Sequence, residues 1–120
     1  MIVKESGLFL LETKAHGGRI SVKEGRLLVN GHDPEKDFIA QALHNRYWLR
    51  EKTRPVLNLE PWITPVLVFT NAFVERTAPV KGVKITNKNY LLSILLKPNS
   101  KAGDSAVWEN RAKILQALSA

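Results

Sequence analysis

The chain has 120 residues, no cysteine and a net charge of +7, and its length suits one domain with a buried core. Without cysteine it forms neither a disulfide nor a thiolate metal site, and the lack of any apolar run of ~18 residues excludes a membrane-spanning helix. The basic balance attracts phosphate backbones as well as other anionic surfaces. Because the N-terminus has no secretion signal, we expect a cytoplasmic protein.

The first quarter of the chain predicts two β-hairpins. Residues 1–3 and Leu8–Thr13 are apolar and flank a turn-like segment. The second of these runs is nearly continuous, which is typical of a strand that is buried on both faces. A second hairpin follows, because Ile20 and Val22 alternate with polar neighbours and residues 26–29 supply a partner strand.

The next segment predicts the longest helix. Asp33 is expected to cap it, Pro34 suits the first helical position, and Asp37 is expected to be a solvated acid of the first turn. We expect the helix to end near Arg50, and residues 53–61, with prolines near both ends, to form a loop. The inner stripe, at helical spacing, consists of Ile39, Ala42, Leu43 and Leu49.

Two more strands are expected after this helix. Ile63–Thr70 is a second apolar run with Pro65 near its start, where a missing backbone donor is tolerated. Residues 71–79 are expected to form a loop, and Val83–Ile85 a short strand. Buried strands separated by a helix indicate an α/β domain with a covered central sheet.

Two helices are expected to end the domain, which spans residues 1–120. Thr86 or Asn87 is expected to cap a helix that ends at Leu96, and Asp104 to cap the last one. The inward residues of the last helix are expected to be Val107, Trp108, Ile114, Leu115 and Leu118.

Glu12 and Lys14 stand two residues apart at the end of an apolar strand, so their side chains share one face. One interpretation is a strand end that emerges into water, where the two charges are solvated or paired, because Glu-x-Lys is a common tripeptide. The other is a metal site in which Glu12 and the Thr13 carbonyl bind a hard divalent ion such as Mg²⁺. Lys14 would then orient or deprotonate a metal-associated water, or stabilise charge on a phosphate.

The segment Ser6–Lys14 resembles the glycine, aromatic, aliphatic, Glu-Thr-Lys core of the nuclease-related domain (NERD) family. The resemblance implies the restriction-endonuclease-like fold of the PD-(D/E)xK superfamily, with a central mixed β-sheet flanked by helices. It also implies Mg²⁺ or Mn²⁺ as cofactor, and Glu12, Lys14 and Gln41 as catalytic residues. Further matching features are Gly17-Gly18 with Ile20, Gln41, the strand Pro65–Phe69, Val83–Leu92 and the terminal helix.

The family's remaining acidic ligand lies on the strand before this core. If residues 4–7 form the loop, Ile2 faces Phe9, and the position that faces Glu12 lies two residues before Met1. We therefore expect an aspartate upstream, in a domain whose N-terminal helix and strand start are truncated here. The alternatives are a domain that binds nucleic acid without cutting it, and replacement of the aspartate by Glu5, Asp33 or Asp37.

The expected activity is metal-dependent hydrolysis of phosphodiester bonds, on DNA rather than RNA, impaired in this chain by the missing aspartate. The alternative functions are a non-catalytic DNA- or RNA-binding module on the same fold, and an interaction module with further domains or subunits. For Trp48 the alternative is core packing, and for the histidines it is solvation. The residues expected to contact nucleic acid are His16, His44, Arg46, Trp48 and Arg50.

Overall fold

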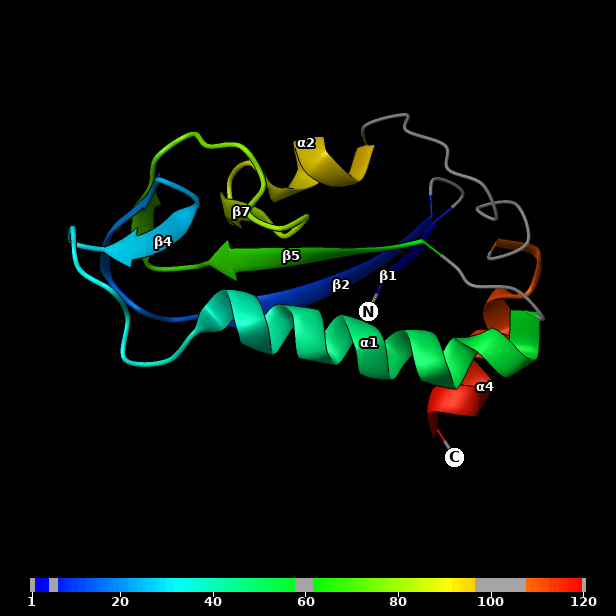
Figure 1. Cartoon of the computed structure of the whole chain (residues 1–120). Coiled ribbons are helices and arrows are strands. Elements are labelled where there is room, and N and C mark those ends of the chain that lie inside the picture. The colour runs from blue at the N-terminus through cyan, green and yellow to red at the C-terminus, as the bar shows by residue number, and fades with distance from the viewer. Residues whose placement is uncertain (1, 5–6, 58–61, 97–107, 120) are drawn as a thin grey trace.

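The computed structural model describes residues 2–4, 7–57, 62–96 and 108–119. Two β-sheets are flanked by helices in a mixed α/β architecture (Figure 1), as expected for a restriction-endonuclease-like fold. Within this described part of the chain, no helix combines the length and the apolarity that crossing a membrane requires.

The larger sheet contains the two apolar runs as neighbouring strands. Its strands, in spatial order, are β1 (Ile2–Lys4), β2 (Gly7–Lys14), β5 (Ile63–Phe69) and β7 (Lys84–Asn87). Strands β1 and β2 are antiparallel with Ile2 opposite Phe9, which confirms the predicted register. The β2–β5 and β5–β7 pairs are parallel, with Glu12 opposite Leu67.

The smaller sheet has the order β4 (Arg26–Val29), β3 (Gly18–Lys23) and β6 (Ala72–Val74). The β3–β4 hairpin confirms the prediction, whereas β6 lies in the segment that was wrongly expected to be a loop. Strand β3 starts at Gly18, whose φ of 96° and close approach to the Asn30 side chain leave no room for a Cβ atom. The Asn30 Oδ1 accepts a hydrogen bond from the Arg19 amide at 2.9 Å and so fixes this start.

Helix α1 (Phe38–Leu57) begins later than predicted. Its cap is Asp37, whose Oδ1 accepts a hydrogen bond from the Ala40 amide at 3.0 Å. The expectation that Asp33 is the cap is therefore wrong, and so is that of a solvated Asp37. The Asp33 carboxylate instead forms an ion pair with Arg26 of β4, a partner that local sequence does not reveal.

The same helix also ends later than predicted, so the expected loop is wrong for residues 53–57, while 58–61 lie outside the described residues. Thr53 is fully buried, and its hydroxyl donates to the Leu49 carbonyl at 3.0 Å. Pro55 has no amide hydrogen, yet the helix continues past it. Tertiary packing of Leu49 and Thr53 extends the helix beyond the point that the proline suggests.

Helix α1 covers one face of the larger sheet and α2 (Leu91–Leu96) covers the other (Figure 1). The predicted stripe of α1 is confirmed, with Leu43 partly buried and the other three residues buried; Phe38 is a further buried residue of this helix. On the opposite face, Asn87 caps the turn before α2, since its Oδ1 accepts from the Tyr90 amide at 3.0 Å. This confirms one of the two predicted caps.

Helix α4 (Arg111–Ser119) packs against α1 (Figure 1). Ile114 is fully buried as expected and Trp108 is half-buried, but Leu115 is 52% exposed, which contradicts its predicted inward position. Adjacent helical residues point about 100° apart, so Leu115 can face outward beside the buried Ile114. Asp104 and Val107 lie outside the described residues, as does the side chain of Leu118.

Candidate active site at the end of strand β2

Two charged residues of β2 are held by two amide side chains of α1. The Lys14 Nζ donates to Gln41 Oε1 at 2.7 Å, and the Asn45 Nδ2 donates to Glu12 Oε1. Two residues along a strand advance about 6.6 Å, and four residues along a helix about 6 Å. The two spacings match, so a strand and a helix that lie side by side hold both pairs at once.

The aromatic ring of Phe38 forms the floor below Lys14. The Lys14 Nζ lies 5.0 Å from the centre of this ring, a cation–π contact, and the His16 ring meets it edge-on at 5.0 Å. Phe38 is buried and contacts the fully buried Phe69 of β5 in turn. At the end of β2, the polar side chains of Lys14 and His16 thus both lie against the buried ring of Phe38, which packs on Phe69.

The backbone of β2 directs the Thr13 carbonyl away from β5. In a strand, the N–H and C=O groups of successive residues point alternately to the two neighbouring strands. The Lys14 carbonyl accepts from the Thr70 amide at 3.0 Å and therefore points toward β5. The Thr13 carbonyl points to the other side, where the described pairing with β1 ends at Phe9. This oxygen therefore lies on the side of β2 away from β5, next in the chain to Glu12.

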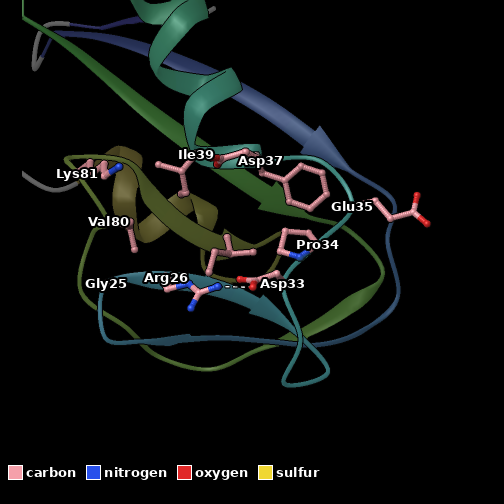
Figure 2. A pocket seen from close by; sticks show the side chains of 11 residues that line it. Gly25, Arg26, Asp33, Pro34, Glu35, Asp37, Ile39, Val80 and Lys81 are labelled. Atoms are coloured by element: carbon pink, nitrogen blue, oxygen red, sulfur yellow. Dashed lines mark hydrogen bonds and ion pairs between the residues drawn. The ribbon is translucent and has the colours of Figure 1, made fainter.

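The acids weighed as substitutes for an upstream aspartate have other roles. Asp33 pairs with Arg26, Asp37 caps α1, and Glu5 lies outside the described residues. Asp33, Glu35 and Asp37 line a separate cavity of about 360 Å³ between β4, the start of α1 and Val80-Lys81, and Figure 2 shows Glu35 directed away from the other two. In the described ranges, no three His, Cys, Asp or Glu side chains gather in a way that could hold a metal ion.

The residues predicted to contact nucleic acid do not form one cluster. Trp48 is exposed and lies on the Gln41 and Asn45 side of α1, because it follows Asn45 by three residues. Arg46 and Arg50 lie on the opposite flank, where Arg46 approaches Gly82. Burial, and then the charge of Arg50, lower the pKa of Arg46. His44 is exposed on the outer side of the helix.

Arg46, Trp48 and Arg50 are close in sequence, but positions two apart on a helix point about 200° apart. Although the three residues are close in sequence, they therefore do not share one surface of the helix. Asn45 is the site residue that the sequence interpretation missed. Its signal was the four-residue spacing from Gln41, which matches the two-residue spacing of Glu12 and Lys14.

The family model of the nuclease-related domain matches residues 1–70. Comparison with curated proteins and with solved structures gives no match. The matched segment contains Glu12, Lys14, Gln41 and Asn45 and ends directly after β5. With 70 of its 120 residues matched, the chain belongs to the nuclease-related domain family.

Proposed function

We propose that this domain hydrolyses phosphodiester bonds of nucleic acid in a metal-dependent reaction at the end of β2, once the position opposite Glu12 is an aspartate. Membership of the family associates the chain with nucleic acid in general. The observation that supports the finer proposal is the pair of charges on one face of β2, each bonded to an amide of α1. A strand end that merely emerges into water has no need of two matched helix amides.

The donor atoms at this end of β2 suit a hard divalent cation. Glu12 offers a carboxylate, and the Thr13 carbonyl, next to it in the chain, is directed away from β5. Mg²⁺ and Mn²⁺ prefer such oxygen ligands. When bound there, the ion would supply a water of lowered pKa and a positive charge for the phosphate oxygens.

The side chains around these donors have separate tasks in the proposal. Asn45 orients the Glu12 carboxylate through one oxygen and leaves the other free for a ligand. Gln41 holds the Lys14 Nζ, whose remaining protons can reach a phosphate oxygen and stabilise the charge that develops there. Gln41 and Asn45 are thus positioning residues, whereas Glu12 and Lys14 contact the reacting groups.

The register of the β1–β2 hairpin supports the proposal of a second carboxylate opposite Glu12. Ile2 lies opposite Phe9, so each step upstream on β1 corresponds to one step downstream on β2. The position opposite Glu12 is then two residues before Met1. Directly opposed residues of antiparallel strands have Cβ atoms about 5 Å apart, a distance at which two carboxylates can share an ion.

The test compares this chain with a protein that begins further upstream in its native sequence. Each is incubated with plasmid DNA and with single-stranded DNA, with and without Mg²⁺ or Mn²⁺. We expect metal-dependent cleavage by the longer protein and its loss in Glu12→Ala. Glu109→Ala, a change of an exposed acid near α4, is the matched control and should retain cleavage.

Two results would contradict the proposal. One is a non-acidic residue opposite Glu12 in the longer protein. The other is metal-dependent cleavage that persists in Glu12→Ala while the protein remains folded.

A second candidate function is a nucleic-acid-binding module without cleavage. It is favoured by the observation that Glu12 is the one carboxylate that the described residues bring to Lys14, Gln41 and Asn45. Its binding would rest on the net charge of +7 and on cations such as Arg46 and Arg50. It predicts affinity that falls steeply with salt and does not require Mg²⁺. Affinity that is the same at low and high salt would exclude it.

A further inference from the structure

The polar row of α1 continues beyond the two amides that hold Glu12 and Lys14. Trp48 follows Asn45 by three residues and Lys52 follows Trp48 by four, so all of them lie on one side of the helix. The hydrogen bonds of Gln41 and Asn45 identify this as the side beside β2. The row therefore leads from the site along the outer edge of the domain.

Trp48 is an exposed aromatic side chain with a cation beside it. Trp48 is 52% exposed, whereas its neighbour Leu49 is 2% exposed and lies on the buried side of α1. The Lys52 Nζ lies 5.8 Å from the centre of the Trp48 ring, within the range of a cation–π contact. The indole thus lies beside a cation and is half-exposed.

The distance along the helix fits a neighbouring nucleotide. Trp48 lies about 4.5 Å further along the helix axis than Asn45, and successive nucleotides of one strand rise about 3.4 Å in a duplex and more when extended. A phosphate at Glu12 and Lys14 therefore places the base of an adjacent nucleotide within reach of Trp48. Glu51, which follows Trp48 by three residues, is paired with Arg54 at 2.7 Å, so its negative charge is partly balanced.

We propose that Trp48 and Lys52 form a stacking subsite for an unpaired nucleotide, so that this domain prefers single-stranded or frayed nucleic acid to closed duplex. The inference rests on the proposed function, because it takes the phosphate position from that site. An indole can stack only on a base whose face is free, and inside a duplex both faces of each base are covered by neighbours. Lys52 then contacts the phosphate that follows the stacked base.

The test measures binding without cleavage, so that it does not depend on metal or on an upstream aspartate. Fluorescence anisotropy of a labelled thymidine oligonucleotide and of a duplex of equal length is recorded at low salt with a chelator present. Trp48→Ala should weaken single-strand binding by roughly tenfold or more and duplex binding by less than about twofold. Trp48→Phe should retain most of the single-strand affinity.

Tyr47→Ala is the matched control, since Tyr47 is a similarly exposed aromatic that points about 100° away from Trp48 around the same helix. It should leave both affinities unchanged. A parallel readout is quenching of tryptophan emission by the single strand, which should persist in Trp62→Phe and disappear in Trp48→Phe.

Three outcomes would overturn the subsite. The first is equal weakening of single-strand and duplex binding in Trp48→Ala. The second is no binding of single strands by the unaltered chain. The third is a concentration-dependent dimer that Trp48→Ala dissociates without changing the affinity for single strands, which would assign the indole to contact with a second copy. If the longer protein shows no metal-dependent cleavage while the effect of Trp48→Ala on single-strand binding is observed, the proposed hydrolysis alone is refuted.

Discussion

The two faces of the larger sheet are built from the same strands but tolerate different chemistry. Toward α2, Phe9, Val66 and Val68 pack against Leu91, Ile94 and Leu95, and this cluster is entirely apolar. Toward α1, the same strand β2 presents Glu12 and Lys14. The difference lies in the covering helix, because α1 supplies amide groups at the right spacing and α2 supplies aliphatic side chains.

A half-buried charge on a sheet is stable only where a polar partner replaces the water that it loses. The α1 face has amide partners from the helix at the end of β2, whereas α2 supplies aliphatic side chains and the polar groups beside Val68 are the hydroxyls of Thr13 and Thr86 on the adjacent strands. This contrast predicts how substitutions on the two faces will differ.

The largest effect is expected for Val68→Asp, which places a charge on the α2 face. Val68 is 2% exposed, and the α2 side chains that cover it are aliphatic, so a carboxylate there would lose most of its water without gaining a cationic or amide partner from the helix. We expect a loss of about 3–5 kcal/mol in the free energy of unfolding, measured by urea denaturation. Val68→Ala, which removes only apolar contacts, should cost about 2 kcal/mol. Equal stability of the two variants would refute the contrast between the faces.

On the α1 face, Asn45→Leu should have the next largest effect. It leaves the half-buried Glu12 carboxylate without the hydrogen bond that Asn45 donates. We expect a loss of about 2 kcal/mol in the free energy of unfolding. The double variant Glu12→Leu with Asn45→Leu should recover most of this loss, because neither polar group is then left unpaired. Additive losses would show that the bond does not stabilise the fold.

Asn45→Asp should cost about 1–2 kcal/mol without metal, because it sets a second carboxylate against Glu12. The same pair of carboxylates should bind a divalent ion, so that Mn²⁺ in tenfold excess over its Kd restores about 1.4 kcal/mol. Thermal unfolding with and without Mn²⁺ measures both effects. Gln41→Asp, which adds its carboxylate beside Lys14 instead, is the control and should show a smaller response to Mn²⁺.

The smallest effect is expected for Gln41→Leu. The bond between Gln41 and Lys14 is exposed to solvent, so water can replace it. We expect less than about 0.5 kcal/mol in the free energy of unfolding. A loss as large as that of Asn45→Leu would show that the bond between Gln41 and Lys14 is as well shielded from water as the bond between Asn45 and Glu12.

The parts of the fold that follow from local pattern could be predicted from the sequence. The register of β1 with β2 follows from a short hairpin, and the inner stripe of α1 from helical spacing. Strand β6 could not be predicted, since its three residues owe their conformation to pairing with β3, far away in the chain. The start of α1 was predicted wrongly because Asp33, the expected cap, forms an ion pair with Arg26 of β4 instead.

The candidate site, too, could be predicted only in part. The shared face of Glu12 and Lys14 comes from the two-residue period of a strand. Which helical side chains meet them depends on how α1 lies across the sheet, and no local pattern contains this information. The bond between Asn45 and Glu12 therefore emerged only in the folded chain, whereas the separation of Trp48 from the arginines already follows from helical spacing.

Between one polar pair and the next, β2 advances by two residues and α1 by four, and the two advances differ slightly in length. The step of the strand exceeds that of the helix by about 0.6 Å, which is comparable with the whole range of lengths of a good hydrogen bond. Two pairs can therefore be kept in register, but the offset accumulates at each further step. The next step brings Leu10 and Leu49, whose apolar contacts are indifferent to such an offset. The mismatch of the two spacings thus limits how many polar pairs β2 and α1 can form in succession.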